Sequence, residues 1–401
     1  MLILAALAVA VGVGAAPALA AGGSASGGAA PSGSSPYPTC YTTLVNGTPT
    51  CLGAHVVYDP VDGYLVDYML CLGGPTLFES CTWTYANGSW TNITATDGPN
   101  PPGFLDPGFV WDAADGYALL FGELSYPLGH RGLDAWSFRG GVWTNLTVPT
   151  PESAIWFATE AAYDSTLGEV VALWAPGPYY LGTAGVTSWA YRAGRWTNLT
   201  GLAAPPKLGQ SLLIDDPAVA GLLAYGGFGV SGAWQPATWE FANGTWTNLT
   251  SAATPPADVV GSALAYDPFT GQVMLVGGQI ESCASGVCPV LAFMWLFGGD
   301  AWVNVTGSVA GPLPIEADGI LVANPPSGQM IEGFGTASVG GTALANVDTP
   351  QSHLYLYANG AWSSVAASSA AGPAPPTVLW IAVGAGVAVA AVAAWAGLRR
   401  R

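Results

Sequence analysis

The chain has 401 residues, and 8% of them are charged, about a third of the usual share in globular proteins. Disordered chains combine low hydrophobicity with high charge, whereas 51% of these residues are hydrophobic, so disorder is excluded for most of the length. Eight Lys and Arg against 25 Asp and Glu give a net charge of −17, which leaves no basic face for binding nucleic acid.

Residues 1–20 are typical of a secretory signal peptide. An apolar run over residues 2–13 is followed by Ala18-Leu19-Ala20, the small-x-small pattern of a cleavage site. The alternative is an N-terminal membrane anchor, but the run is shorter than the roughly 20 residues that a span needs. Residues 21–36 are rich in Gly, Ser and Pro and are predicted to be a linker.

Residues 378–398 carry no charge and predict a single transmembrane helix. Trp380 and Trp395 stand near its ends, and residues 399–401 are three arginines, which favour the cytoplasmic side. Residues 367–377 then form a Pro/Ala stalk, and residues 37–366 an extracellular body. The sequence thus predicts a single-pass protein of the cell membrane with its N-terminal body outside.

Six cysteines fit an oxidising exterior. Among the 15 possible pairings, the nearest-neighbour set needs only short loops and is favoured: Cys40 with Cys51, Cys71 with Cys81, and Cys283 with Cys288. We predict neither a metal site nor a cofactor, because there is no Cys-x-x-Cys and the three histidines lie far apart in the sequence.

The body is a repeat of 50 to 60 residues. Six segments share one ending, WTYANGSWTNIT and its variants, which begin at Trp83, Trp136, Trp189, Trp239, Trp295 and Tyr355. Pairs such as Asn87-Gly88 predict two-residue hairpin turns with positive φ. Such a turn places Tyr85 across from Trp90 and Trp83 across from Asn92, so these four side chains share one face of a sheet.

A second hairpin precedes each of these endings, as in VVYDPVDGYLVDYML of the first repeat. Each repeat therefore holds four antiparallel strands, a to d. Four-stranded units at this period predict the blades of an all-β propeller, followed by the one transmembrane helix. We expect six blades within residues 37–366, although LVNGTPT, at residues 44–50, could close the ring or add an incomplete seventh blade.

The repeats resemble the kelch family, in particular kelch-like propellers of archaeal and bacterial cell surfaces. A glycine pair ends strand b in Gly73-Gly74, Gly226-Gly227 and Gly277-Gly278, and a Trp-x-Tyr/Phe and a Gly-x-Trp hairpin follow. The resemblance spans residues 51–365 and implies a six-bladed kelch-like β-propeller. Blade two departs from it with Gly122-Glu123, and the sixth blade is loose throughout.

Two sets of repeated residues have a structural alternative to a functional role. Acidic residues of the a–b turns are expected to bond their own backbone rather than a metal: Asp59, Asp112, Asp164, Asp215 and Asp267. Eight Asn-x-Ser/Thr sequons are candidate glycan acceptors in an exported chain: Asn46, Asn87, Asn92, Asn145, Asn198, Asn243, Asn248 and Asn304. For the five within the repeat ending, the alternative is packing or a role in the strand ladder.

The short a–b and c–d turns share one face of the ring, called the turn face below. The longer, variable b–c and d–a loops form the opposite loop face, where binding is expected. Its candidate contact residues, each of which could instead be a solvated loop side chain, are Tyr126, His130, Arg131, Trp156, Tyr179, Tyr180, Trp234 and Glu281. No catalytic residue is predicted from any local motif.

Regular repeats without a nucleophile or cofactor motif favour a non-catalytic binding, adhesion or envelope protein, with a surface protein or a glycan as partner. The alternative is a surface carbohydrate-active enzyme or an oxidase resembling galactose oxidase. A second alternative is a purely structural coat component. The acidic excess suggests an exterior suited to acid or salt, where carboxylates are neutralised or screened.

Overall fold

The computed structural model describes the strands of the repeat body and the connections that order them. The described residues are 42–45, 48–51, 55–71, 79–104, 107–123, 133–146, 159–174, 186–200, 211–229, 234–251, 253–256, 259–280, 289–317, 319–333 and 354–365. The predicted signal peptide, linker, stalk and transmembrane helix lie outside them. Within the described part of the chain, no helix is long and apolar enough to cross a membrane.

Six four-stranded antiparallel sheets follow one another along the chain, as the repeat predicts. Blades one to three are β3(His55–Asp59), β4(Tyr64–Cys71), β5(Glu79–Ala86), β6(Ser89–Asn92); β7(Gly108–Asp112), β8(Tyr117–Glu123), β9(Leu133–Arg139), β10(Val142–Asn145); and β11(Thr159–Asp164), β12(Glu169–Trp174), β13(Thr187–Arg192), β14(Arg195–Asn198). Blades four to six are β15(Leu212–Asp216), β16(Gly221–Tyr225), β17(Thr238–Ala242), β18(Thr245–Asn248); β20(Ala263–Asp267), β21(Gln272–Val276), β23(Met294–Gly298), β24(Ala301–Asn304); and β25(Ile320–Asn324), β26(Gln329–Gly333), β27(Leu354–Ala358), β28(Ala361–Val365).

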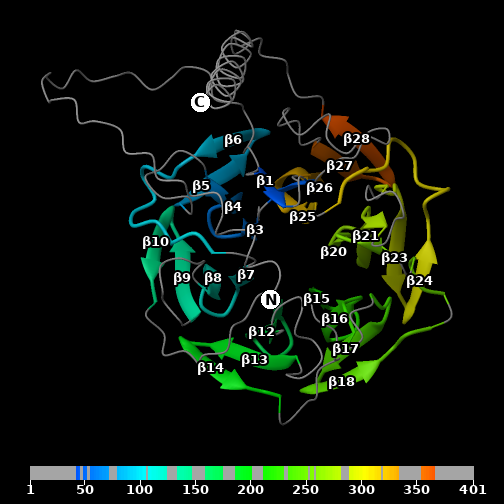
Figure 1. Ribbon diagram of the computed structural model, residues 1–401, viewed down its shortest axis with the longest axis horizontal. Coiled ribbons are helices and arrows are strands. Elements are labelled where there is room, and N and C mark those ends of the chain that lie inside the picture. Colours follow the sequence, from blue (N-terminus) through cyan, green and yellow to red (C-terminus); the bar gives the residue numbers. More distant parts are fainter. Residues whose placement is uncertain are drawn as a thin grey trace, which may run out of the picture. The chain divides into compact units, whose positions relative to one another are not determined.

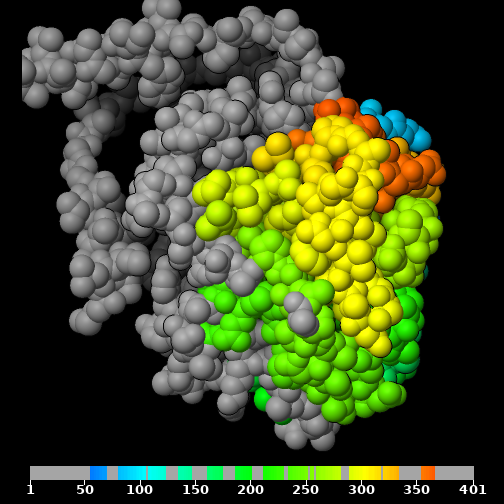
Figure 2. All heavy atoms as spheres, turned by 90° about the vertical axis from the view of Figure 1, so that its right-hand side faces the viewer, coloured from blue at the N-terminus to red at the C-terminus, as the bar shows by residue number. Residues whose placement is uncertain are grey.

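The blades form a closed ring with strand a innermost and strand d at the rim (Figure 1). Each strand a contacts the strands a of both neighbouring blades, and β25 contacts β3 to complete the circle. Figure 2 views the ring from its rim and shows blades four to six side by side. This confirms an all-β propeller of six blades, each made of four consecutive strands.

Two short strand pairs and one 3₁₀ turn lie outside or between the main sheets among the described residues. The hairpin of β1(Thr42–Val45) and β2(Thr48–Cys51) forms a two-stranded sheet of its own, so LVNGTPT adds no strand to a blade. A second two-stranded sheet pairs β19(Val259–Val260) with β22(Gln279–Ile280) at blade five. A single 3₁₀ turn, η1(Pro325–Ser327), joins β25 to β26.

The c–d hairpins have the predicted register. Tyr85 pairs with Trp90 and Trp83 with Asn92. Asn87 and Gly88 at the tip have φ of 53° and 81°, the mirror-image turn whose twist matches that of the strands. The aromatic pair of each hairpin has ring centroids 5.0 to 5.2 Å apart in all six blades.

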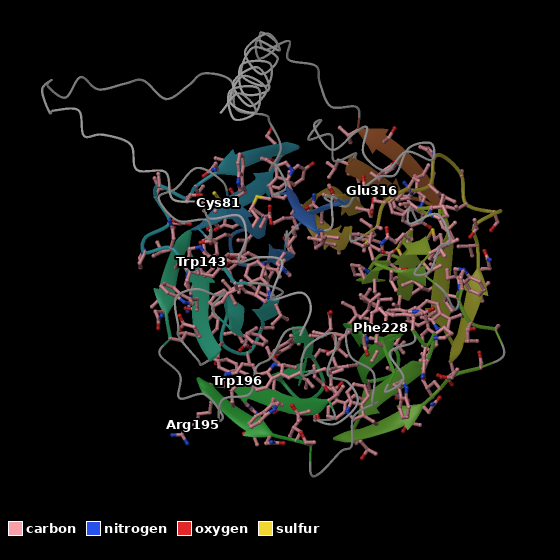
Figure 3. All side chains as sticks on the ribbon, in the orientation of Figure 1. Cys81, Trp143, Arg195, Trp196, Phe228 and Glu316 are labelled. Carbon is pink, nitrogen blue, oxygen red and sulfur yellow. The ribbon has the colours of Figure 1, made fainter. Side chains whose placement is uncertain are left out.

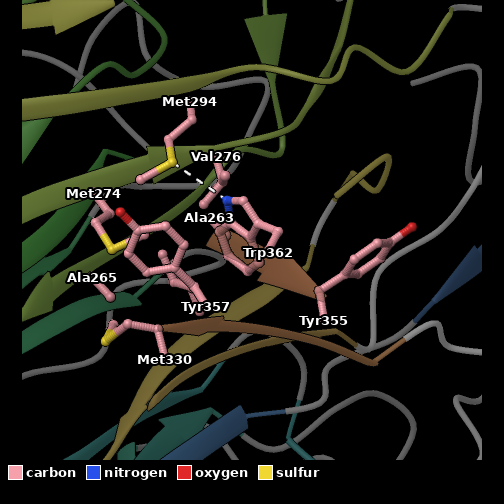
Figure 4. Close-up of a cluster of buried hydrophobic side chains, with 10 residues drawn as sticks. Ala263, Ala265, Met274, Val276, Met294, Met330, Tyr355, Tyr357 and Trp362 are labelled. Carbon is pink, nitrogen blue, oxygen red and sulfur yellow. Dashed lines mark hydrogen bonds between the residues drawn. The ribbon is translucent and has the colours of Figure 1, made fainter. Parts of the chain in front are cut away.

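The hydrophobic core is divided among the six junctions between blades. Leu65, Tyr85 and Trp90 of blade one pack on Ile331 and Leu354 of blade six. The other junctions repeat this arrangement, and Figure 4 shows the one between blades five and six, where the Trp362 indole nitrogen donates to the Met294 sulfur at 3.4 Å. The b strands are buried on both faces, whereas the d strands are largely exposed, so the low charge is explained best for the inner part of each sheet.

Buried acidic residues close the a–b turns through their own backbone, as expected. Asp59 Oδ1 accepts the N–H groups of Val61 and Asp62 at 2.8 and 3.1 Å, and the equivalent bonds form at Asp112 and Asp164. In blade four the prediction of Asp215 is wrong. The register pairs Asp216 with Gly221, so Asp216 closes the turn, and Asp215 accepts from Ser165 of blade three instead.

Cys81 is disulfide-bonded. The other five cysteines have side chains outside the described residues, so the three pairings stay predictions.

Trp143 and Trp196 point inward from the sheets, whereas Arg195 projects from the rim (Figure 3).

Candidate functional site

One position of strand b distinguishes blades one and six from the other four. It lies across from the first aromatic residue of strand c. Blades two to five fill it with Leu120, Ala172, Ala224 and Leu275. Blade one has Asp67 there, paired with Trp83, and blade six has Glu332, paired with Tyr355. Two adjacent blades thus carry a carboxyl group at a position that is otherwise apolar.

Glu332 forms a buried pair with a second carboxyl group, that of Glu316. The two residues are each 2% exposed. Glu316 comes from the d–a loop before β25, and Glu332 stands next to the end of β26, so both lie toward the loop face (Figure 3 labels Glu316). Burial raises the pKa of Glu332 well above its usual range, and the charge of Glu316 raises it further. Two like charges held close together in a buried site oppose each other's ionisation, so each carboxyl group makes the second loss of a proton harder.

Glycines make room for this pair. The Gly278 N–H donates to the Glu316 carbonyl oxygen at 2.9 Å. A Cβ on Gly277, whose φ is +62°, would lie 2.6 Å from that same oxygen. A Cβ on Gly319 would lie 2.5 Å from Glu332 Oε1. The glycine pair that ends strand b of blade five therefore positions the loop that carries Glu316.

Tyr355 completes the group. It is 7% exposed and pairs with Glu332 across β26 and β27. Burial raises the pKa of its hydroxyl, and the charges of Glu316 and Glu332 raise it further. The group combines two coupled carboxyl groups and a phenol, which are residue types that can supply an acid and a base in one place.

Asp67 is the isolated counterpart of this pair. It is fully buried, and no side chain in the described part of the chain hydrogen-bonds to its two carboxylate oxygens. Burial raises its pKa to about 8, which the nearby His55 backbone N–H partly opposes. Burial also lowers the pKa of His55, the first residue of β3, to about 4. Asp67 is therefore a neutral acid at physiological pH.

The contact residues predicted from the loops are not brought together in the described structure. Tyr126, His130, Arg131, Trp156, Tyr179, Tyr180 and Glu281 lie outside the described residues. Trp234 is described, and its indole packs over Gly226 and edge-on to Phe228, with ring centroids 5.4 Å apart. Its side chain is half-buried, and its role as a contact residue stays a prediction.

Sequence reasoning predicted the loop face but missed Glu316 and Glu332. The available signal was the strand-b position itself, because an alignment of the six upstream hairpins puts acidic residues there only in blades one and six. Among the described residues, no group of three or more His, Cys, Asp or Glu could hold a metal ion.

Comparisons with known proteins identify the fold alone. No protein-family model and no curated protein matches the chain. Among solved structures, one titled "Structure of YjhT" is similar at a TM-score of 0.52 and 12% identity, over 81% of this chain and 99% of that one. The chain is also similar to an α-L-arabinanase of Penicillium chrysogenum (TM-score 0.42, 12% identity, 65% and 80% of the two chains). A third similar structure is the α-L-arabinofuranosidase Arb93A of Fusarium graminearum. Its TM-score is 0.47 and its identity 12%, over 71% of this chain and 88% of that one.

These comparisons bear on two expectations. The two structures whose titles state an activity are enzymes that act on carbohydrates, so the comparisons give no support to the expectation of a non-catalytic binding or adhesion protein. They are also not kelch proteins by title, so what is established is the six-bladed propeller and not the kelch family.

Proposed function

We propose that the protein is a carbohydrate-active enzyme that hydrolyses glycosidic bonds at the Glu316–Glu332 pair. The observation that carries the proposal is a buried pair of carboxyl groups toward the loop face, in which burial and the charge of Glu316 raise the pKa of Glu332. Glycoside hydrolysis needs this combination, because one carboxylic acid protonates the leaving oxygen while a second carboxylate acts as base or nucleophile.

The environments of the two groups suggest their roles. Glu332 has the raised pKa and lies against Gly319, so it is the general acid that protonates the glycosidic oxygen. Glu316 is the carboxylate partner that activates water or attacks the anomeric carbon. Tyr355, neutral beside both, can donate a hydrogen bond to the developing charge.

The test measures hydrolysis of a panel of aryl glycosides, pentofuranosides included, by the purified protein and its variants. Glu332→Gln and Glu316→Gln are each expected to lower kcat by about 10² to 10⁴, the usual contribution of an acid or base. Glu169→Gln is the matched control, because Glu169 starts β12 beside the turn face and takes no part in the pair.

A purely structural role for the pair predicts a different result. In that case the two Gln variants would change the unfolding midpoint and leave kcat intact. Unchanged kcat in both variants, or no hydrolysis of any glycoside by the unaltered protein, contradicts the proposed function.

The cellular setting completes the proposal. The apolar ends of the sequence support an exported protein anchored in the cell membrane by residues 378–398, with glycans outside the cell as substrates.

A kelch-type relationship is proposed as well. It is supported by the glycine pairs Gly226-Gly227 and Gly277-Gly278, which share nearly the same backbone, φ of 70° and 123° in one and 62° and 123° in the other.

A further inference from the structure

Four Asn-x-Thr sequons share one arrangement at the outer edge of the ring. They belong to Asn92, Asn198, Asn248 and Asn304, the last residues of β6, β14, β18 and β24. Each Asn Oδ1 accepts the backbone N–H of the Thr two residues later, at 2.8 to 3.0 Å. That Thr Oγ1 in turn accepts a backbone N–H of strand c at 3.0 to 3.1 Å.

This arrangement leaves the acceptor nitrogen available. The four Asn side chains are exposed, and their Nδ2 groups donate no hydrogen bond to any residue that the structure describes. The carbonyl oxygen is fixed by the Thr N–H, so the amide has one orientation with its nitrogen toward solvent. The sequon therefore does more than cap the strand.

A partly exposed tryptophan stands beside each of these nitrogens. The register pairs the four Asn with Trp83, Trp189, Trp239 and Trp295, all half-buried. Residues paired in this way have Cβ atoms about 4.5 to 5.5 Å apart. A sugar joined to Nδ2 would lie over the indole, and the apolar C–H face of a pyranose packs well on an aromatic ring.

The two remaining blades lack this combination. In blade two, Asn145 Nδ2 donates to the Asp134 carboxylate at 3.3 and 3.5 Å, and the Trp136 indole nitrogen donates to the same carboxylate at 3.1 Å. In blade six, Ser364 replaces Asn and pairs with Tyr355, which is buried beside Glu332. The free amide and the half-exposed indole thus occur together or not at all.

We propose that Asn92, Asn198, Asn248 and Asn304 carry N-linked glycans whose first sugar lies on the cross-strand tryptophan, and that Asn145 carries none. Nδ2 bonds to the anomeric carbon of a lipid-diphosphate-linked oligosaccharide, loses one proton, and the lipid diphosphate leaves. The modification rests on the expected export of the body. It covers the unpaired edges of four outer strands and leaves those of blades two and six bare.

The test is glycopeptide mass spectrometry of the full chain purified from its native membranes. We expect glycans at the four positions and unmodified Asn145, together with unmodified Asn87 and Asn243, which lie at turn tips with no cross-strand tryptophan. Four unmodified positions, or equal occupancy at Asn145, would overturn the proposal.

Two variants separate the glycan from the strand cap. Asn198→Asp keeps the oxygen that accepts the Thr200 N–H and removes the acceptor nitrogen, so the mass should fall by one glycan, whereas Asn87→Asp should leave the glycan mass unchanged. Asp134→Ala releases the Asn145 amide and should add occupancy there. An unchanged glycan mass in Asn198→Asp, or no gain at Asn145 in Asp134→Ala, counts against the proposal.

Discussion

At the residue scale, indole nitrogens link some blades and not others. The Trp143 indole nitrogen donates to Thr82 Oγ1 at 2.7 Å across the junction of blades one and two, and that of Trp302 donates to Thr238 Oγ1 at 2.9 Å across blades four and five. The indole nitrogens of Trp196 and Trp246 have no such partner among the described residues. The packing of the strand-d tryptophans is therefore common to these blades. The hydrogen bond from the indole nitrogen to a threonine hydroxyl forms only at some of the junctions between described blades.

Thr82→Val should destabilise the protein by about 1 to 3 kcal/mol, because it leaves a buried indole N–H without a partner while keeping the side-chain shape. Urea unfolding measures the loss. Thr91→Val, on the exposed face of β6, is the control and should change the stability by less than about 0.5 kcal/mol. Equal effects of the two substitutions would show that the indole bond adds no stability.

At the element scale, glycines serve two separate purposes. In the c–d hairpins, a glycine such as Gly88 supplies a positive φ in open space, with no atom within 4 Å of a built Cβ. At the end of β21, Gly277 supplies a positive φ and also lets the Glu316 backbone approach. The first kind sets a local turn, whereas the second sets the distance between two blades.

Gly88→Ala should therefore cost only the strain of a positive φ, about 1 to 2 kcal/mol. Gly277→Ala should cost more than Gly88→Ala and should also lower hydrolytic activity, because its Cβ would push away the loop that carries Glu316. Thermal unfolding and the glycosidase assay, run on both variants, check this. Equal losses of stability with full activity in both would contradict the positioning role of Gly277.

At the scale of the whole molecule, buried acids make stability depend on pH. The pKa of Asp67 is raised to about 8, that of Asp112 to about 6, and that of Glu332 well above its usual range, each mainly by burial. A raised folded-state pKa gives stability that is present below the unfolded value and is lost as the pH rises through the folded value. His55, with its pKa lowered to about 4, acts in the opposite direction below about pH 6.5.

Between pH 6.5 and 8 the free energy of unfolding should therefore fall, because Asp67 stays largely protonated in the folded state while it is ionised in the unfolded chain, and His55 no longer contributes. Each unit of pKa shift corresponds to about 1.4 kcal/mol. Urea unfolding across this pH range measures the fall. Asp67→Asn should reduce its slope, and an identical slope in that variant would exclude Asp67 as its source.

The sequence alone was sufficient for the propeller, because its signals are local. Each hairpin tip, aromatic pair and turn aspartate lies within about ten residues of its partners, so six repetitions predicted six blades with their register. The one local error, Asp215 for Asp216, arose because two adjacent aspartates fit the same turn and only strand pairing selects between them.

The tertiary structure decided what the blades bring together. Glu316 and Glu332 become a coupled buried pair because a loop packs between blades five and six, and the Trp234 indole lies over Gly226 because that glycine has no side chain. The free amides of Asn92 and Asn198 differ from the tied amide of Asn145 only through Asp134. Such environments depend on burial and on contacts between segments, which repeat patterns do not encode, whereas turns and strand pairing depend on neighbours along the chain.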